Sequence, residues 1–168
     1  MLNVQLNNRS KVWQRVISYC LLPIACCLLF SSCTTIDLYE KSVAIPGHSW
    51  KSDFKPSFIF TIKDTTSYQL FLILRHNDKY NYNNIYINLS AKLPGSDSTR
   101  KIRKDLILAT NDQGWLGSGM DDIYEHRIPL GDPERLKAGN YTFTVEQIMR
   151  EDPLNNVLDV GLRIEKKQ

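Results

Sequence analysis

The chain has 168 residues, of which 21 are basic and 18 acidic, and a formal net charge of +3 at pH 7. Three of the basic residues and none of the acidic ones lie in the first 32 positions, so residues 33–168 are formally neutral. This balance argues against nucleic-acid binding, which needs a net basic face. The 136 residues from position 33 onward suffice for one domain with a single core.

Residues 1–32 have the pattern of a secretory signal peptide. Three basic residues precede an apolar run at residues 16–30, which contains Pro23. A positive head followed by a short apolar run is typical of a cleaved export signal. The run of 15 residues is also short for a membrane-spanning helix, which needs about 20 apolar residues. We therefore expect an exported protein.

Cys33 ends the sequence Phe30-Ser31-Ser32-Cys33, which resembles the bacterial lipobox. The resemblance implies that the signal is cut before Cys33 and that this residue carries a diacylglyceryl group and a further acyl chain such as palmitate. The alternative is an ordinary cleaved signal with a chance cysteine at the junction. Because two or more acyl chains anchor a protein stably, the first reading predicts a domain tethered to the cell envelope through Cys33.

Cysteine usage agrees with this division of the chain. Cys20, Cys26 and Cys27 would leave with the signal, and only Cys33 would remain. The exported domain would then contain no disulfide, and we expect its own apolar core to hold it together.

Residues 33–52 are predicted to be a lipid-anchored tether that leads into a domain at residues 53–168. No helical period is sustained in this stretch, and Pro46-Gly47 marks a turn. Trp50 follows the turn, and we expect it to dock on the edge of the domain.

From residue 54 onward, apolar and polar residues alternate with the period of β-strands. The predicted strands are residues 58–63, 68–75, 85–91, 100–109, 123–130, 141–149 and 157–165. The second of these is apolar on both faces, which indicates a central strand. Seven or eight strands without a long helix predict an all-β fold, an antiparallel β-sandwich of the jelly-roll or immunoglobulin-like type.

Two loops carry further expectations. Residues 111–122 contain three of the eight glycines, which predicts an ordered irregular loop with Trp115 and Leu116 inserted in the core. Asp132-Pro133 has the pattern of a short helical turn, with Asp132 as its cap.

Motifs that carry chemistry are scarce. His48, His76 and His126 lack metal-ligand spacing, and we expect them to be exposed or singly hydrogen-bonded. Asp121-Asp122 lacks the alternating acids of a calcium loop, and no nucleotide-binding or nucleophile-elbow motif is present. The residues therefore give no positive sign of catalytic residues, and we expect no metal, cofactor or small-molecule substrate. The sequence leaves open whether two carboxylates form a glycosidase pair, because the fold sets the distance between them.

Tyr80, Tyr82 and Trp115 form the candidate binding surface. The two tyrosines lie in an asparagine-rich stretch, and such aromatic and amide groups stack on sugars or contact proteins. The alternative is a tyrosine-rich hairpin whose rings lie flat on their own sheet. Burial of Trp50, Trp115 and the tyrosines would count against glycan binding.

Several short segments in one order resemble the gliding motility lipoprotein GldH family. They are Ile45-Pro46 with Trp50, residues 64–68, residues 74–77 with Tyr80 and Tyr82, residues 114–119, residues 139–143, residues 147–150 and residues 159–165. The resemblance implies a non-enzymatic accessory subunit of the gliding apparatus, which is linked to type IX secretion. It also implies attachment to the outer membrane and contacts with envelope proteins of the motility or secretion machinery. The alternative function is a membrane-anchored glycan-binding β-sandwich module.

Overall fold

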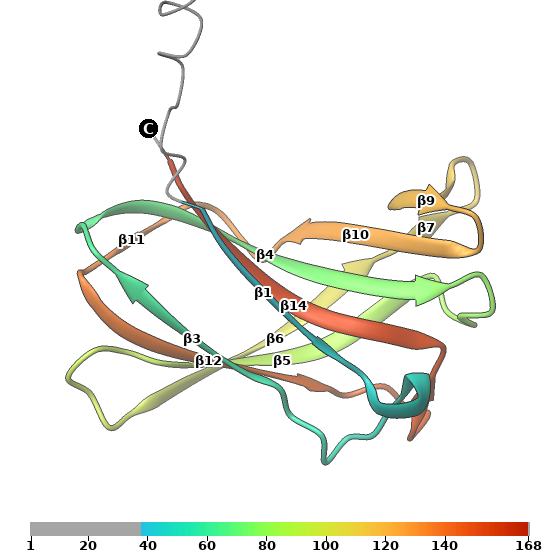
Figure 1. The fold of residues 1–168 in the computed structure, drawn as a ribbon, viewed down its shortest axis with the longest axis horizontal. Helices are drawn as coiled ribbons and strands as arrows, with labels where there is room; N and C mark the ends of the chain where they lie inside the picture. Colours follow the sequence, from blue (N-terminus) through green and yellow to red (C-terminus); the bar gives the residue numbers. More distant parts are fainter. Residues whose placement is uncertain (1–37, 168) are drawn as a thin grey trace, which may run out of the picture. The chain divides into compact units, whose positions relative to one another are not determined.

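The structure is a computed structural model that describes residues 38–167 (Figure 1). These residues contain no α-helix, and their long strands pair antiparallel in two sheets that pack as a β-sandwich, which confirms the predicted all-β class. Eight of the described strands have six or more residues, in line with the predicted seven or eight. Within this range no helix is long and apolar enough to cross a membrane. The predicted signal peptide and Cys33 lie outside the described residues.

The first sheet is built around β4, as the two-sided apolar run predicts. Its strands are, in order, β1 (Leu38–Ala44), β14 (Val157–Lys166), β4 (Thr66–Asn77), β10 (Ile123–Pro129) and β9 (Ser118–Met120). A short strand, β11 (Glu134–Leu136), continues along the same side of β4 after β10 ends. β4 is therefore covered by neighbours on both sides.

The second sheet has four strands. They are, in order, β3 (Ser57–Ile62), β12 (Gly139–Gln147), β5 (Asn84–Lys92) and β6 (Thr99–Ile107). Two small pairs complete the domain: β2 (Ser49–Trp50) with β13 (Leu154–Asn155), and β7 (Ala109–Thr110) with β8 (Gly114–Trp115). A 3-10 turn, η1 (Pro46–His48), precedes β2.

The core lies between the two sheets and follows the period-two pattern of the sequence. In β3, Phe58, Phe60 and Ile62 are buried and the residues between them are exposed. The same alternation buries every second residue of β12 from Tyr141 to Gln147. Burial of such side chains at about 25 cal/mol per Å² of apolar surface is the main stabilising contribution.

The described part of the predicted tether is an integral part of the sandwich, so the boundary at residue 53 is wrong. β1 pairs with β14 over its whole length, from Leu38 to Ala44. Trp50 is completely buried rather than docked at an edge, and its Nε1 donates a hydrogen bond to the Phe54 carbonyl oxygen at 2.8 Å. Pairing of β1 with β14 and burial of Trp50 therefore make residues 38–52 part of the folded domain.

Two local predictions in the loops are also wrong. Residues 134–136 form strand β11 instead of a helical turn, because pairing with β4 and burial of Leu136 outweigh the local signal of Asp132-Pro133. Leu116 is 47% exposed and does not reach the core, whereas Trp115 is half-buried and packs against it.

Candidate functional site

Cys33, the predicted lipidation site, precedes the first described strand by five positions. Its lipidation stays a prediction. The position of Cys33 in the chain is compatible with lipidation, because β1 begins only five residues after it. Any lipid on Cys33 would therefore connect to β1 through a short stretch of chain.

The structure brings Tyr80, Tyr82 and Trp115 together but does not expose them as a row. The ring centroids of Tyr80 lie 5.9 Å from Tyr82 and 6.2 Å from Trp115. Tyr80 is only 4% exposed, and Tyr82 is half-buried, with its hydroxyl donating a hydrogen bond to Glu151 at 2.7 Å. Together with the buried Trp50, this leaves the candidate glycan surface without a fully exposed aromatic ring among the residues that motivated it.

The centre of this aromatic cluster is a pair of buried histidines. His126 is singly hydrogen-bonded, as expected, whereas His76 has two hydrogen-bond partners, contrary to the expectation that each histidine is exposed or singly bonded. His76 lies on β4 and His126 on the neighbouring β10, with exposures of 0% and 2%. Their Nε2 atoms are 2.9 Å apart, and the Nδ1 atom of His76 lies 2.7 Å from the Asn77 carbonyl oxygen. Only His48 is exposed as expected.

These distances define the tautomers of a neutral pair. A carbonyl oxygen only accepts, so Nδ1 of His76 carries the proton and donates to Asn77. Nε2 of His76 then accepts a hydrogen bond from the Nε2–H of His126. Burial lowers the pKa of both imidazoles, to about 4 for His126, where the neighbouring His76 adds to the effect. The pair is therefore neutral near pH 7.

Aromatic rings and the glycine-rich loop enclose this pair. The His76 ring lies 4.4 Å from Trp115, 4.9 Å from Tyr80 and 5.7 Å from Tyr124, between centroids. A Cβ atom on Gly117 would lie 2.6 Å from the Glu125 carbonyl oxygen and 3.0 Å from Cε1 of His126. Close approach therefore demands glycine there, which gives one physical reason for the density of glycines in this loop.

The pair does not by itself amount to a metal centre. Two imidazoles supply half of the four ligands of a tetrahedral zinc site. Within residues 38–167, no group of three or more His, Cys, Asp or Glu side chains could hold a metal ion. The sequence contained one usable signal for this pair: His76 and His126 each occupy inward positions in the period-two pattern of their strands.

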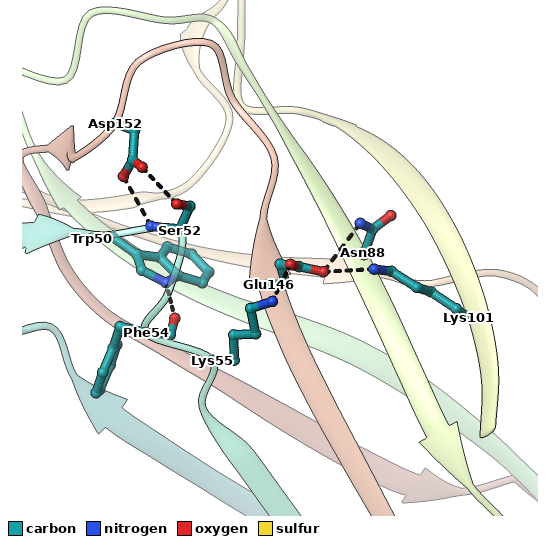
Figure 2. A network of polar contacts seen from close by, with 8 residues as sticks. All are labelled: Trp50, Ser52, Phe54, Lys55, Asn88, Lys101, Glu146 and Asp152. Carbon is teal, nitrogen blue, oxygen red and sulfur yellow. Dashed lines mark hydrogen bonds and ion pairs between the residues drawn. The ribbon is translucent and has the colours of Figure 1, made fainter. Parts of the chain in front are cut away.

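A second polar cluster lies on the outer face of the four-stranded sheet (Figure 2). Glu146 on β12 accepts from Lys101 at 2.8 Å and from Asn88 at 3.3 Å, and pairs with Lys55 at 2.6 Å. The hydrogen bonds from Lys101 and Lys55 lower the pKa of Glu146 to about 2. This carboxylate therefore ties three strands and the segment before β3 together.

Near this network, Asp152 holds the chain that follows Trp50. Its carboxylate accepts from the Ser52 backbone N–H at 2.9 Å and from the Ser52 hydroxyl at 2.5 Å (Figure 2). The hydrogen bonds from Ser52 lower the pKa of Asp152. Both clusters consist of mutually satisfied groups that hold the fold.

Comparison with known proteins gives the family. The model of the family described as GldH lipoprotein matches residues 37–164, which is most of the chain. The chain belongs to the GldH lipoprotein family. A gliding motility lipoprotein GldH homolog from Christiangramia forsetii is 30% identical over 149 residues, covering 83% of this chain and 90% of that protein. Gliding motility lipoprotein GldH of Flavobacterium johnsoniae is 30% identical over 155 residues, covering 88% and 95%.

Two solved structures with low sequence identity resemble this fold distantly. A protein from Sulfurospirillum deleyianum has a TM-score of 0.43 at 16% identity, covering 77% of this chain and 98% of its own. A periplasmic inhibitor of g-type lysozyme from Salmonella Typhimurium has a TM-score of 0.37 at 12% identity, covering 80% and 91%. Likeness at this level carries no conclusion about the function of GldH proteins.

Proposed function

We propose that this protein is an envelope lipoprotein of the gliding motility system, an accessory subunit that acts through protein–protein contacts and not through catalysis. The observation that carries the proposal is the family match across residues 37–164, together with two relatives that are named gliding motility lipoproteins. The proposal places lipid on Cys33, the cysteine that ends the lipobox-like sequence. It places the protein in the outer membrane, in the vicinity of the type IX secretion machinery, on the family resemblance.

The chemistry of the described residues supports a structural role. The two buried histidines bond to each other within a ring of aromatic side chains. Carboxylates whose pKa is lowered, Glu146 and Asp152 among them, are hydrogen-bonded to lysines, amides and hydroxyls of their own domain. Side chains that are bonded within their own domain hold strands and loops in place, and a rigid docking module requires such fixed positions.

Affinity purification from detergent-solubilised envelopes tests this function. The tagged wild-type protein is compared with the Cys33→Ala variant, and copurifying proteins are identified by mass spectrometry. We expect motility or secretion components with the wild type and their loss with the variant, which also leaves the membrane fraction. Recovery of abundant lipoproteins alone would overturn the proposal, and a glycan screen would then test the alternative module.

A further inference from the structure

Strand β6 forms the edge of the four-stranded sheet. All nine of its residues, Thr99 to Ile107, pair with β5, and the sheet order ends at β6. No other strand within residues 38–167 pairs with it (Figure 1). Edge strands of this length present a row of unpaired backbone donors and acceptors, which can template the addition of another strand.

The hydrogen-bond pattern identifies the outward groups. The backbone N–H of Leu108 donates to the Asn83 carbonyl oxygen at 2.7 Å, which extends the β5–β6 register by one pair. Opposed residues of an antiparallel pair alternate between hydrogen-bonded and non-bonded. Residues 100, 102, 104 and 106 therefore bond to β5, and the N–H and C=O groups of residues 101, 103, 105 and 107 point away from the sheet.

The other side of β5 gives the same assignment independently. The Ile148 N–H donates to the Tyr86 carbonyl oxygen at 3.0 Å, so even-numbered residues of β5 bond toward β12. Odd-numbered residues of β5 must then bond toward β6, which pairs Ile87 with Lys104 and Leu89 with Ile102. Both observations leave the odd-numbered backbone groups of β6 at the free edge.

Strand β6 is net basic, with four cationic residues against one acid, Asp105. Four of five consecutive residues are cationic, namely Arg100, Lys101, Arg103 and Lys104. Arg103 is exposed on the outer face and lies 5.0 Å from the Tyr86 ring centroid, and Lys101 on the same face approaches Glu146. Like charges opposed across paired strands destabilise the pairing. An acidic strand would therefore be attracted more strongly than a second copy of this strand.

A small apolar cavity lies behind the same strand. Its volume is about 100 Å³, and it is lined from both sheets by residues that include Ile102, Leu130, Leu136 and Phe143. Arg100 and Lys104 line it from β6, and Asp132 and Glu134 line it from the facing segment. The acids on that facing segment disfavour a second acid on the inner side, so an apolar side chain suits the inner face of an added strand.

We propose that β6 docks an extended segment of a partner protein in which acidic and apolar residues alternate. The segment adds as a fifth strand, with its backbone bonded to residues 101, 103 and 105. Its acidic side chains lie on the outer face beside Lys101 and Arg103, and an apolar side chain opposite Ile102 faces the cavity. Backbone bonds supply affinity and alternate side chains supply specificity in this mode of recognition. The proposal rests on the function proposed above, since it names the surface through which the protein contacts a partner.

A synthetic peptide tests the site directly. The probe is a fluorescently labelled nine-residue peptide of alternating Glu and Val, titrated with the full-length lipidated protein in detergent micelles and followed by fluorescence anisotropy. We expect salt-sensitive binding, with about tenfold weaker affinity for Arg103→Glu. The matched control is Arg127→Glu, an exposed strand arginine on the other sheet, and it should bind as the wild type does.

A second variant isolates the backbone contribution when it is compared with Arg103→Ala, which loses the same charge but keeps its N–H. Arg103→Pro removes an outward N–H that β5 does not use, a position that proline tolerates in edge strands. It should weaken binding more than Arg103→Ala does, while thermal unfolding shows that each variant stays folded. Equal affinity of Arg103→Glu and Arg127→Glu, equal affinity for a Lys-Val peptide, or no binding of the Glu-Val peptide to the wild type would each overturn the docking site.

Affinity purification of the same variants distinguishes this proposal from the broader function. Loss of envelope partners with Arg103→Glu and their retention with Arg127→Glu support the docking site. Equal recovery with both variants leaves the proposed function standing and overturns the role of β6. If the wild type recovers no partners, the proposed function fails, and the peptide titration still decides whether β6 accepts an acidic strand.

Discussion

Mild acid should destabilise this protein through the buried pair His76 and His126. Burial, reinforced by His76, lowers the pKa of His126 to about 4 in the folded state, against about 6.5 in an unfolded chain. The folded state therefore binds fewer protons than the unfolded state between these values. The contribution of this group to the free energy of unfolding is fully present above about pH 6.5 and is lost as the pH falls towards 4.

The size of the effect follows from the same two pKa values. Between pH 8 and pH 5, one group with this shift lowers the free energy of unfolding by about 2 kcal/mol. His76, whose pKa is also lowered by burial, acts in the same direction. Because whole domains have about 5–15 kcal/mol of stability, a loss of this size is readily measured.

Urea unfolding at pH 8 and pH 5, followed by tryptophan fluorescence, measures the loss. His126→Gln keeps an N–H donor for His76 and removes one titrating imidazole, so this variant should lose most of the difference between the two pH values. The matched control is His48→Asn, because His48 is exposed and has a positive φ of 56° that asparagine also adopts. An equal pH dependence in the wild type and His126→Gln would refute the reasoning.

Four further outcomes are expected, the first three measured by urea unfolding at pH 7.5. Trp50→Ala should cost about 3–5 kcal/mol, because this ring is completely buried, and a cost below 1 kcal/mol would contradict its place in the core. Gly161→Ala should cost about 1–3 kcal/mol, since a Cβ there would collide with Ser42 on β1. Leu116→Ser should stay within about 0.5 kcal/mol of the wild type, because Leu116 is exposed. Glu146→Gln should lower the free energy of unfolding, measured by urea unfolding at low and at high salt, by about 1 kcal/mol at low salt and by less at high salt, because salt screens partly exposed ion pairs. A loss of stability that does not depend on salt would argue against the ion pairs.

The sequence predicts those strands whose own alternation of apolar and polar residues shows which face is buried. Phe58, Phe60 and Ile62 show their inward face without reference to any partner, and so do Val160, Leu162 and Ile164 on β14. β4 likewise shows that it is central, because it is apolar on both faces.

The parts that the sequence predicts poorly depend on partners far away in the chain. β1 carries charged residues on both of its faces, Glu40 on one and Lys41 on the other, so it resembles a linker until β14, more than 110 residues later, pairs with it. The His76–His126 contact depends on the register between β4 and β10, which local spacing does not contain. The same limit applies to Asp132-Pro133, whose local helical signal yields to pairing of the next residues with β4.

The pairing of β1 with β14 also has a mechanical consequence. Seven residue pairs join the strands, from Leu38 opposite Glu165 to Ala44 opposite Asp159 (Figure 1). A load that enters at Leu38 and is directed along β1 strains these pairs in shear, so that they resist together; a load directed across the strand would open them one after another. In a protein held by its N-terminal end, β1 is the first strand to bear tension, and its resistance depends on the direction of pull.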